Sequence, residues 1–225
     1  MTEGSVWVEQ REIFTNYSLL ITNLEKSVVG CRSTILQGML QEEINKAVEV
    51  LRSGGVILYP TDTVWGIGCD ATNAEAVERI YKLKGSVNKK GMIVLVDEPT
   101  TVGRYIKRVP EVAWDLLELS DKPLTLILDG AVGVAPNLIP EEGSLAVRVA
   151  DHDFCRGVVR RLRRGLVSTS ANFSGEPTPT TFEEIAEGIK SGVDHIVSTA
   201  VEGNPTRKAS SIMVLHEDGS FKILR

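Results

Sequence analysis

The sequence predicts an α/β fold in which helices cover the faces of one mixed sheet. Apolar, β-branched runs typical of buried strands alternate with helical patterns from Met39 to the end of the chain. No linker divides this region. Two final apolar runs, over residues 211–215 and 221–224, flank Glu217-Asp218-Gly219 and predict a hairpin, which adds antiparallel pairing. We therefore expect a single layered domain.

The first 38 residues differ from the rest. Val6-Trp7-Val8 could form a short strand, but no helix or strand period persists before Met39. From Met39 onward apolar residues recur at helical spacing, and Gly54-Gly55 ends that helix. We expect a domain over residues 39–225 and an N-terminal extension over residues 1–38, either dispensable or structured and packed on the domain. A chain that begins at Met39 and fails to fold would contradict dispensability.

The first half of the domain continues with two strands and two helical regions. A buried strand is expected over residues 56–58, followed by a loop over residues 59–71. Thr72-Asn73-Ala74-Glu75 has capping-box spacing and opens a helix that stops near Gly85. A strand over residues 92–96 follows. Helical patterning then covers residues 100–119, with Pro110 as the first residue of a new helix.

The second half repeats the alternation. Strands are expected over residues 124–128, 145–149, 166–169 and 195–198, with a loop over residues 132–143. Helices are expected over residues 153–164 and 181–191. The second of these begins at Thr181-Phe182-Glu183-Glu184, which again has capping-box spacing.

Composition excludes several classes of protein. The 225 residues are 42% hydrophobic and 24% charged, as in an ordinary globular protein. A net charge of −5 argues against a grip on nucleic acid by bulk electrostatics, although a local basic patch stays possible. Cys31, Cys69 and Cys155 show no disulfide or zinc pattern, so no metal ligands are predicted. No signal peptide or membrane-spanning run is visible, and the cytoplasm is the expected compartment.

Three stretches could carry chemistry at strand ends. The loop over residues 59–71 gathers Thr61, Asp62 and Thr63 with two glycines, and is either a ligand site or an ordinary connection. Residues 82–91 hold four lysines, which suit a polyphosphate or form a solvated basic loop. Residues 166–178 hold five hydroxyl side chains and an amide after a buried strand. This placement favours a ligand site over a polar turn.

Arginines form two further candidates. Arg148 lies alone in an apolar strand, so it is either an anion ligand or half of a structural ion pair. An arginine-rich helix could touch RNA or form a solvated basic face; its members are Arg156, Arg160, Arg163 and Arg164 on one face, with Arg161 beside them. No paired-carboxylate or nucleophile–base motif is visible. An enzyme of this kind would act by positioning and phosphate electrostatics, and a reaction at ATP would need Mg²⁺.

In this order, the stretches resemble the YrdC-like family of threonylcarbamoyl-AMP synthases, in its single-domain form (the TsaC group). The resemblance covers residues 39–225 and rests on three segments. Residues 54–71 match the family's opening signature, and Ser170-Ala171-Asn172-Phe173-Ser174-Gly175 matches its SAN-x-SG segment. Residues 145–152 are similar to its strand that carries an arginine before an acidic-His turn.

The resemblance implies a twisted open mixed sheet around a concave, positively lined ligand cavity. Members join L-threonine, bicarbonate and ATP into L-threonylcarbamoyl-AMP and release pyrophosphate, with Mg²⁺ accompanying ATP. The product feeds threonylcarbamoyl-adenosine modification of tRNA by a separate transferase complex. Transient contact with tRNA or with that complex is therefore expected, and no contact with a membrane.

The resemblance also implies roles for particular residues. Lys84 would face the phosphates and is the expected catalytic residue. Threonine would be bound by Thr61, Thr63 and Ser210. ATP would be bound by Lys84, Thr125, Arg148, Ser168, Ser170, Asn172, Thr178 and Arg225.

Two positions depart from the family pattern. Ser86 stands where the family usually has arginine, and Lys90 where it has asparagine, so Lys89 or Lys90 would have to replace the lost phosphate contact. Two alternatives stay open. One is a non-catalytic, YciO-like RNA-binding module, and the other is a domain that forms carbamoyl-adenylate from carbamoyl phosphate.

Overall fold

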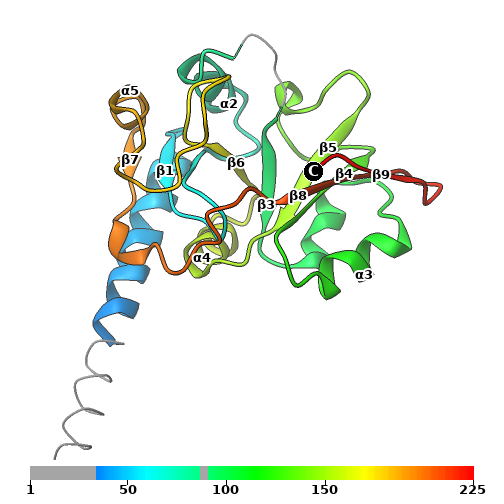
Figure 1. Ribbon diagram of the computed structural model, residues 1–225, viewed down its shortest axis with the longest axis horizontal. Helices are drawn as coiled ribbons and strands as arrows, with labels where there is room; N and C mark the ends of the chain where they lie inside the picture. Colours follow the sequence, from blue (N-terminus) through cyan, green and yellow to red (C-terminus); the bar gives the residue numbers. More distant parts are fainter. Residues whose placement is uncertain (1–33, 87–90) are drawn as a thin grey trace, which may run out of the picture. The chain divides into compact units, whose positions relative to one another are not determined.

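The computed structural model describes residues 34–86 and 91–225 (Figure 1). Contacts divide the chain into Met1–Leu40 and Gln41–Arg225, and the second unit carries the sheet. Residues 34–52 are helical, so the predicted helix start at Met39 is too late. The prediction relied on the apolar period, which starts near Met39, whereas residues 34–38 are helical although their side chains are exposed. The short strand predicted at Val6-Trp7-Val8 lies outside the described residues.

Among the described residues, nine strands form one sheet in the order β7-β1-β2-β6-β3-β5-β4-β8-β9. Their bounds are β1 Ile57–Tyr59, β2 Gly66–Gly68, β3 Ile93–Val96, β4 Leu124–Asp129, β5 Ser144–Val149, β6 Leu166–Ser170, β7 His195–Ile196, β8 Ser211–Leu215 and β9 Phe221–Ile223. β3 pairs with β5 in parallel and with β6 antiparallel, which confirms the mixed sheet. The predicted terminal hairpin is also confirmed, because β8 pairs antiparallel with β9.

Helices and 3₁₀ turns connect the strands. The α-helices are α2 Ala74–Leu83, α3 Glu111–Leu119, α4 Asp153–Leu162 and α5 Glu187–Lys190, and the 3₁₀ turns are Pro99–Arg104, Pro136–Leu138 and Thr199–Val201. α4 packs its apolar face, including Phe154 and Val158, against β3 and β6. Within the described residues no helix is both long and apolar enough to cross a bilayer.

Two predicted helix starts are off by one residue. Asn73, not Thr72, caps α2, because its side chain accepts a hydrogen bond from the Ala76 amide at 3.0 Å. Thr72 instead donates from its amide and its hydroxyl to Asp70, both at 2.8 Å. Pro110 is the residue before α3 rather than its first helical residue. In each case the helix exists where predicted and its cap differs.

The helix predicted over residues 181–191 is wrong in its first half. Only Glu187–Lys190 is helical. The Glu184 carboxylate accepts hydrogen bonds from the amide and hydroxyl of Thr180, at 2.7 and 3.0 Å, and the Phe182 ring packs 4.9 Å from the Trp65 ring. A helical backbone over this segment would break these contacts, so the segment stays non-helical.

The sequence reading missed β2, because its Gly66-Ile67-Gly68 has little strand propensity. The glycines allow neighbouring strands to pack closely, because they carry no Cβ. A Cβ on Gly68 would lie 2.1 Å from the Val167 carbonyl oxygen and 2.8 Å from the Tyr59 ring. Close approach of β1, β2 and β6 therefore depends on this glycine, and it shapes the loop between β1 and β2.

Gly68→Ala is expected to destabilise the domain by about 1–3 kcal/mol or more, because the clash is with backbone. Thermal unfolding measures the loss. Gly103→Ala is the matched control, since a Cβ there meets only the Trp114 ring at 3.9 Å. Equal stability of the two variants would contradict the steric account of β2.

Candidate functional site

A cavity of about 250 Å³ lies beside the loop that joins β1 to β2. Its walls come from that loop, from β6 and the segment after it, from β4 and β5, and from the start of β8 with the chain's last residue. It brings together most of the predicted site residues: Thr61, Thr63, Thr125, Arg148, Ser168, Ser170, Thr178, Ser210 and Arg225. The remaining lining residues are Val64, Trp65, Gly66, Gly91, Ile93, Thr169, Ala209 and Ile212. Strand ends far apart in sequence thus converge on one polar hollow.

Two predicted site residues, Lys84 and Asn172, do not line this cavity. The Lys84 ammonium donates to the carbonyl oxygens of Ser170 and Asn172, at 2.5 and 2.6 Å. The Asn172 amide donates to the carbonyl oxygens of Phe173 and Glu176, at 2.9 and 2.8 Å. Both side chains hold the segment after β6 in place. Burial lowers the pKa of Lys84 to about 8.

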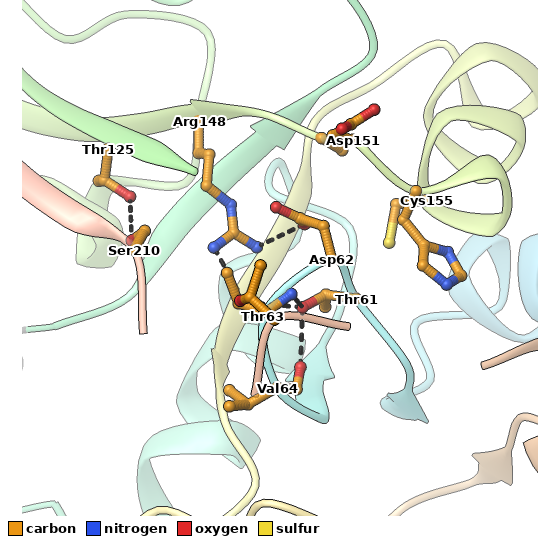
Figure 2. Close-up of polar contacts among 12 residues, drawn as sticks. Thr61, Asp62, Thr63, Val64, Thr125, Arg148, Asp151, Cys155 and Ser210 are labelled. Carbon is orange, nitrogen blue, oxygen red and sulfur yellow. Dashed lines mark hydrogen bonds and ion pairs between the residues drawn. The ribbon is translucent and has the colours of Figure 1, made fainter. Parts of the chain in front are cut away.

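Arg148 forms the structural ion pair that was one of the two alternatives left open by the sequence, and anion binding by it stays a prediction. One nitrogen, Nη2, lies 3.3 Å from Asp62 Oδ1 in an ion pair whose side chains are only 3% and 7% exposed. Another, Nη1, donates to Thr63 Oγ1 at 3.1 Å. Arg148 also lines the cavity, and Figure 2 shows its guanidinium between Asp62 and Thr63.

The threonines of the β1–β2 loop bond to one another. Thr61 Oγ1 lies 2.8 Å from Thr63 Oγ1 and 2.8 Å from the Val64 carbonyl oxygen, and it accepts from the Thr63 amide at 3.0 Å (Figure 2). Thr61 and Thr63 are 2% and 3% exposed. The loop is therefore held together by hydrogen bonds among its own buried residues.

The opposite wall is fixed by the start of β8 and the chain end. Thr125 Oγ1 and Ser210 Oγ lie 2.8 Å apart, and Arg225 Nε donates to the Ser210 carbonyl oxygen at 3.0 Å. β4 and β8 pair in parallel with Thr125 opposite Ile212. This register places the two hydroxyls together, as a shared ligand site requires.

Asp62 is the site residue that sequence reasoning left unassigned. It was noted only as the acid of its loop. The signal was present, because a buried arginine in an apolar strand needs a partner. What the sequence could not show was which carboxylate reaches Arg148 across 86 residues.

The two thiols that the structure describes are poor nucleophiles. Cys69 and Cys155 are buried, and burial raises the pKa of each thiol well above its usual range. Cys31 lies outside the described residues. Within the described part of the chain no group of His, Cys, Asp and Glu side chains is placed to hold a metal ion.

The predicted arginine-rich helix is shorter than expected: α4 ends at Leu162, and Arg163, in the left-handed conformation, and Arg164 lie beyond it. Several of these arginines form ion pairs. Arg160 pairs with Asp97 at 3.2 Å and Arg164 with Asp70 at 2.7 Å, and Arg156 pairs with Asp151. All three side chains are at least one-third exposed. This arrangement agrees with a solvated basic face whose charge is partly offset by local carboxylates.

The lysine-rich turn is described only in part. Ser86 Oγ lies 2.6 Å from Ser174 Oγ, so this serine ties the turn to the segment after β6. Lys89 and Lys90 lie outside the described residues, and their predicted phosphate contact stays a prediction.

Comparison with known proteins gives a consistent result. A family model named for Sua5, YciO and YrdC, and described as "Telomere recombination", matches residues 49–225. A threonylcarbamoyl-AMP synthase of Nitrosococcus oceani is 35% identical over 155 residues, which are 68% of this chain and 84% of the relative. A synthase of the same name from Idiomarina loihiensis is 35% identical over 158 residues and is covered over 85% of its length.

Solved structures agree in fold. P. abyssi Sua5 complexed with L-threonine is 27% identical with a TM-score of 0.74; the match covers 82% of this chain and 54% of that one. E. coli YciO is 26% identical with a TM-score of 0.69, and the match covers 82% of this chain and 89% of that one. The chain thus spans about half of the P. abyssi protein. The expected α/β fold is confirmed, and the chain belongs to the Sua5/YciO/YrdC family.

Proposed function

We propose that the protein is an L-threonylcarbamoyladenylate synthase, a nucleotidyltransferase that joins L-threonine, bicarbonate and ATP and releases pyrophosphate. The observation that carries this proposal is the cavity itself, which the buried Arg148 lines together with eight hydroxyl side chains: Thr61, Thr63, Thr125, Ser168, Thr169, Ser170, Thr178 and Ser210. Relatives of the chain bear the name of this activity. The product would serve threonylcarbamoyl-adenosine modification of tRNA in the cytoplasm, through transient contact with tRNA or the transferase complex.

The lining residues would serve two ligands. L-threonine would contact Thr63 and Ser210, with Thr61 bonded to Thr63 beside it. ATP would be held by Thr125, Arg148, Ser168, Ser170, Thr178 and Arg225, with Lys84 and Asn172 supporting the segment that presents Ser170. Hydroxyls and backbone amides hold phosphate oxygens without adding charge, and Arg148 supplies a fixed cation.

The reaction proceeds by positioning. The threonine amine captures bicarbonate as a carbamate, and a carbamate oxygen attacks the α-phosphorus of ATP in line with the departing pyrophosphate. Mg²⁺ would enter as the partner of the ATP phosphates, and the hydroxyl oxygens that line the cavity are hard oxygen ligands of the kind it accepts. When bound it would offset phosphate charge. The protein's part is to fix the carbamate and the nucleotide in one geometry.

Thermal unfolding with ligands tests this proposal. ATP with L-threonine, each at about 100 times its dissociation constant, should raise the melting temperature by roughly 10–20 °C, because both ligands bind only the folded state. L-Serine at equal concentration is the matched control and should give less. Stabilisation by carbamoyl phosphate with ATP, and none by threonine, would instead support a carbamoyl-adenylate-forming domain.

The RNA-binding alternative predicts a different result. A YciO-like module should bind RNA with an affinity that falls steeply with salt and drops further on Arg160→Glu and Arg163→Glu substitution. It should show no stabilisation by ATP with threonine. That pair of outcomes would overturn the synthase proposal.

A further inference from the structure

The contacts of the β1–β2 loop determine which hydroxyl donates and which accepts in each of its hydrogen bonds. We call this assignment the proton order of the loop. A threonine hydroxyl has one proton and two lone pairs. The Thr61 proton goes to the Val64 carbonyl oxygen at 2.8 Å, because a carbonyl only accepts. One Thr61 lone pair takes the Thr63 amide at 3.0 Å. The remaining 2.8 Å contact with Thr63 Oγ1 must therefore be a bond that Thr63 donates.

This order leaves the Thr63 hydroxyl with one free hydrogen-bonding position. Its proton is directed at Thr61, and one lone pair accepts from Arg148 Nη1 at 3.1 Å. A single lone pair remains, on a side chain that lines the cavity. Toward a ligand, Thr63 Oγ1 can accept a hydrogen bond but cannot donate one. The hydroxyl of Thr61, in contrast, has no capacity left.

The neighbouring guanidinium has the opposite character. Arg148 only donates, and its buried Nε has no hydrogen-bond partner among the residues the structure describes. Asp62 lines another hollow rather than this cavity, and its carboxylate holds Nη2 from behind. An acceptor-only oxygen and a donor-only cation thus stand side by side, 3.1 Å apart, at the wall of the cavity (Figure 2).

We propose that Thr63 and Arg148 together bind the planar one-carbon unit, with Thr63 accepting from its X–H group and Arg148 donating to the adjacent O⁻. This inference rests on the proposed function. Bicarbonate presents an O–H beside an O⁻, and the carbamate presents an N–H beside an O⁻, so both offer the same donor–acceptor edge. The pair therefore fits the unit before and after its transfer to threonine.

The step balances without any further reagent. The amine nitrogen forms a bond to the carbon of bicarbonate, the C–OH bond breaks, and hydroxide leaves with an amine proton as water. The N–H that replaces the O–H keeps the hydrogen bond to Thr63. The remaining oxygens keep their hydrogen bonds from Arg148. Thr61 and Asp62 are positioning residues in this account, the first ordering the Thr63 proton and the second the guanidinium.

Kinetics of pyrophosphate release with bicarbonate as the varied substrate test the role of Thr63. Thr63→Val removes the acceptor at almost unchanged shape and should raise the half-saturating bicarbonate concentration roughly tenfold to a hundredfold. ATP affinity, measured by thermal shift, should change less than threefold. Thr63→Ser, the matched control, keeps the hydroxyl and should keep the half-saturating bicarbonate concentration near that of the native protein. An unchanged half-saturating concentration in Thr63→Val would overturn the inference, whereas an inactive native protein would overturn the proposed function.

A double-mutant cycle tests the positioning role of Thr61. Thr61→Val should raise the half-saturating bicarbonate concentration, and Thr61→Ser should restore it. The Thr61→Val/Thr63→Val double variant should be no worse than Thr63→Val, because Thr61 acts only through Thr63. Multiplying losses would mean that Thr61 contacts the ligand itself, as the sequence predicted, and would refute the deduced proton order.

Discussion

Arg148→Met is expected to abolish pyrophosphate release and to lower the free energy of unfolding by about 3–5 kcal/mol, because it leaves the Asp62 carboxylate buried without its partner. The change keeps the apolar stem of the side chain and removes only the guanidinium. Chemical denaturation measures the stability, and pyrophosphate release measures the function.

The double variant Asp62→Asn/Arg148→Met separates the two effects. A neutral amide tolerates burial better than an unpaired carboxylate, so most of the lost stability should return. Activity should not return, because the cation at the cavity wall is still missing. Recovery of activity in the double variant would mean that Arg148 serves the fold alone.

Affinity for ATP is expected to fall roughly tenfold as the pH rises from 7 to 9. Burial holds the pKa of Lys84 at about 8, below its ordinary value, so the ammonium is mostly present at pH 7 and mostly neutral at pH 9. The Lys84 ammonium contacts the carbonyl oxygen of Ser170 at 2.5 Å, and Ser170 lines the cavity. Loss of the ammonium proton therefore removes a positive charge beside the cavity wall. Calorimetric titration with ATP across this range measures the effect.

Two substitutions at the same position serve as controls. Lys84→Arg stays charged throughout, so its ATP affinity should be flat between pH 7 and 9. Lys84→Met should bind weakly at both values, because it lacks the charge at either pH. A decline in Lys84→Met equal to that of the native protein would assign the pH dependence to another group.

The sequence predicted which residues line the cavity better than it predicted the local structure around them. Hydroxyls that follow apolar strands, such as Ser168 and Ser170, were recognisable because strand ends converge in an open α/β sheet. β2 was missed because its two glycines serve close packing against β6, a contact that strand propensity does not record. The first half of the helix over residues 181–191 failed for a similar reason, since Phe182 packs on the distant Trp65.

Roles that depend on pairing across the chain were beyond the sequence. Arg148 was visible as a lone cation in a strand, yet its link to Asp62 and Thr63 needed the folded loop. Lys84 was expected at the phosphates, and only the structure places its ammonium on the carbonyl oxygens of the segment after β6. Its catalytic role stays a prediction, now with a definite physical route through Ser170.

The central claim is most directly tested by pyrophosphate release from the full chain with ATP and Mg²⁺, omitting L-threonine and bicarbonate in turn. The synthase account predicts release that requires both, together with one adenylate product whose mass contains threonine, one carbon from bicarbonate and AMP. Release that continues without threonine or without bicarbonate would contradict it, as would no release from folded protein that binds ATP.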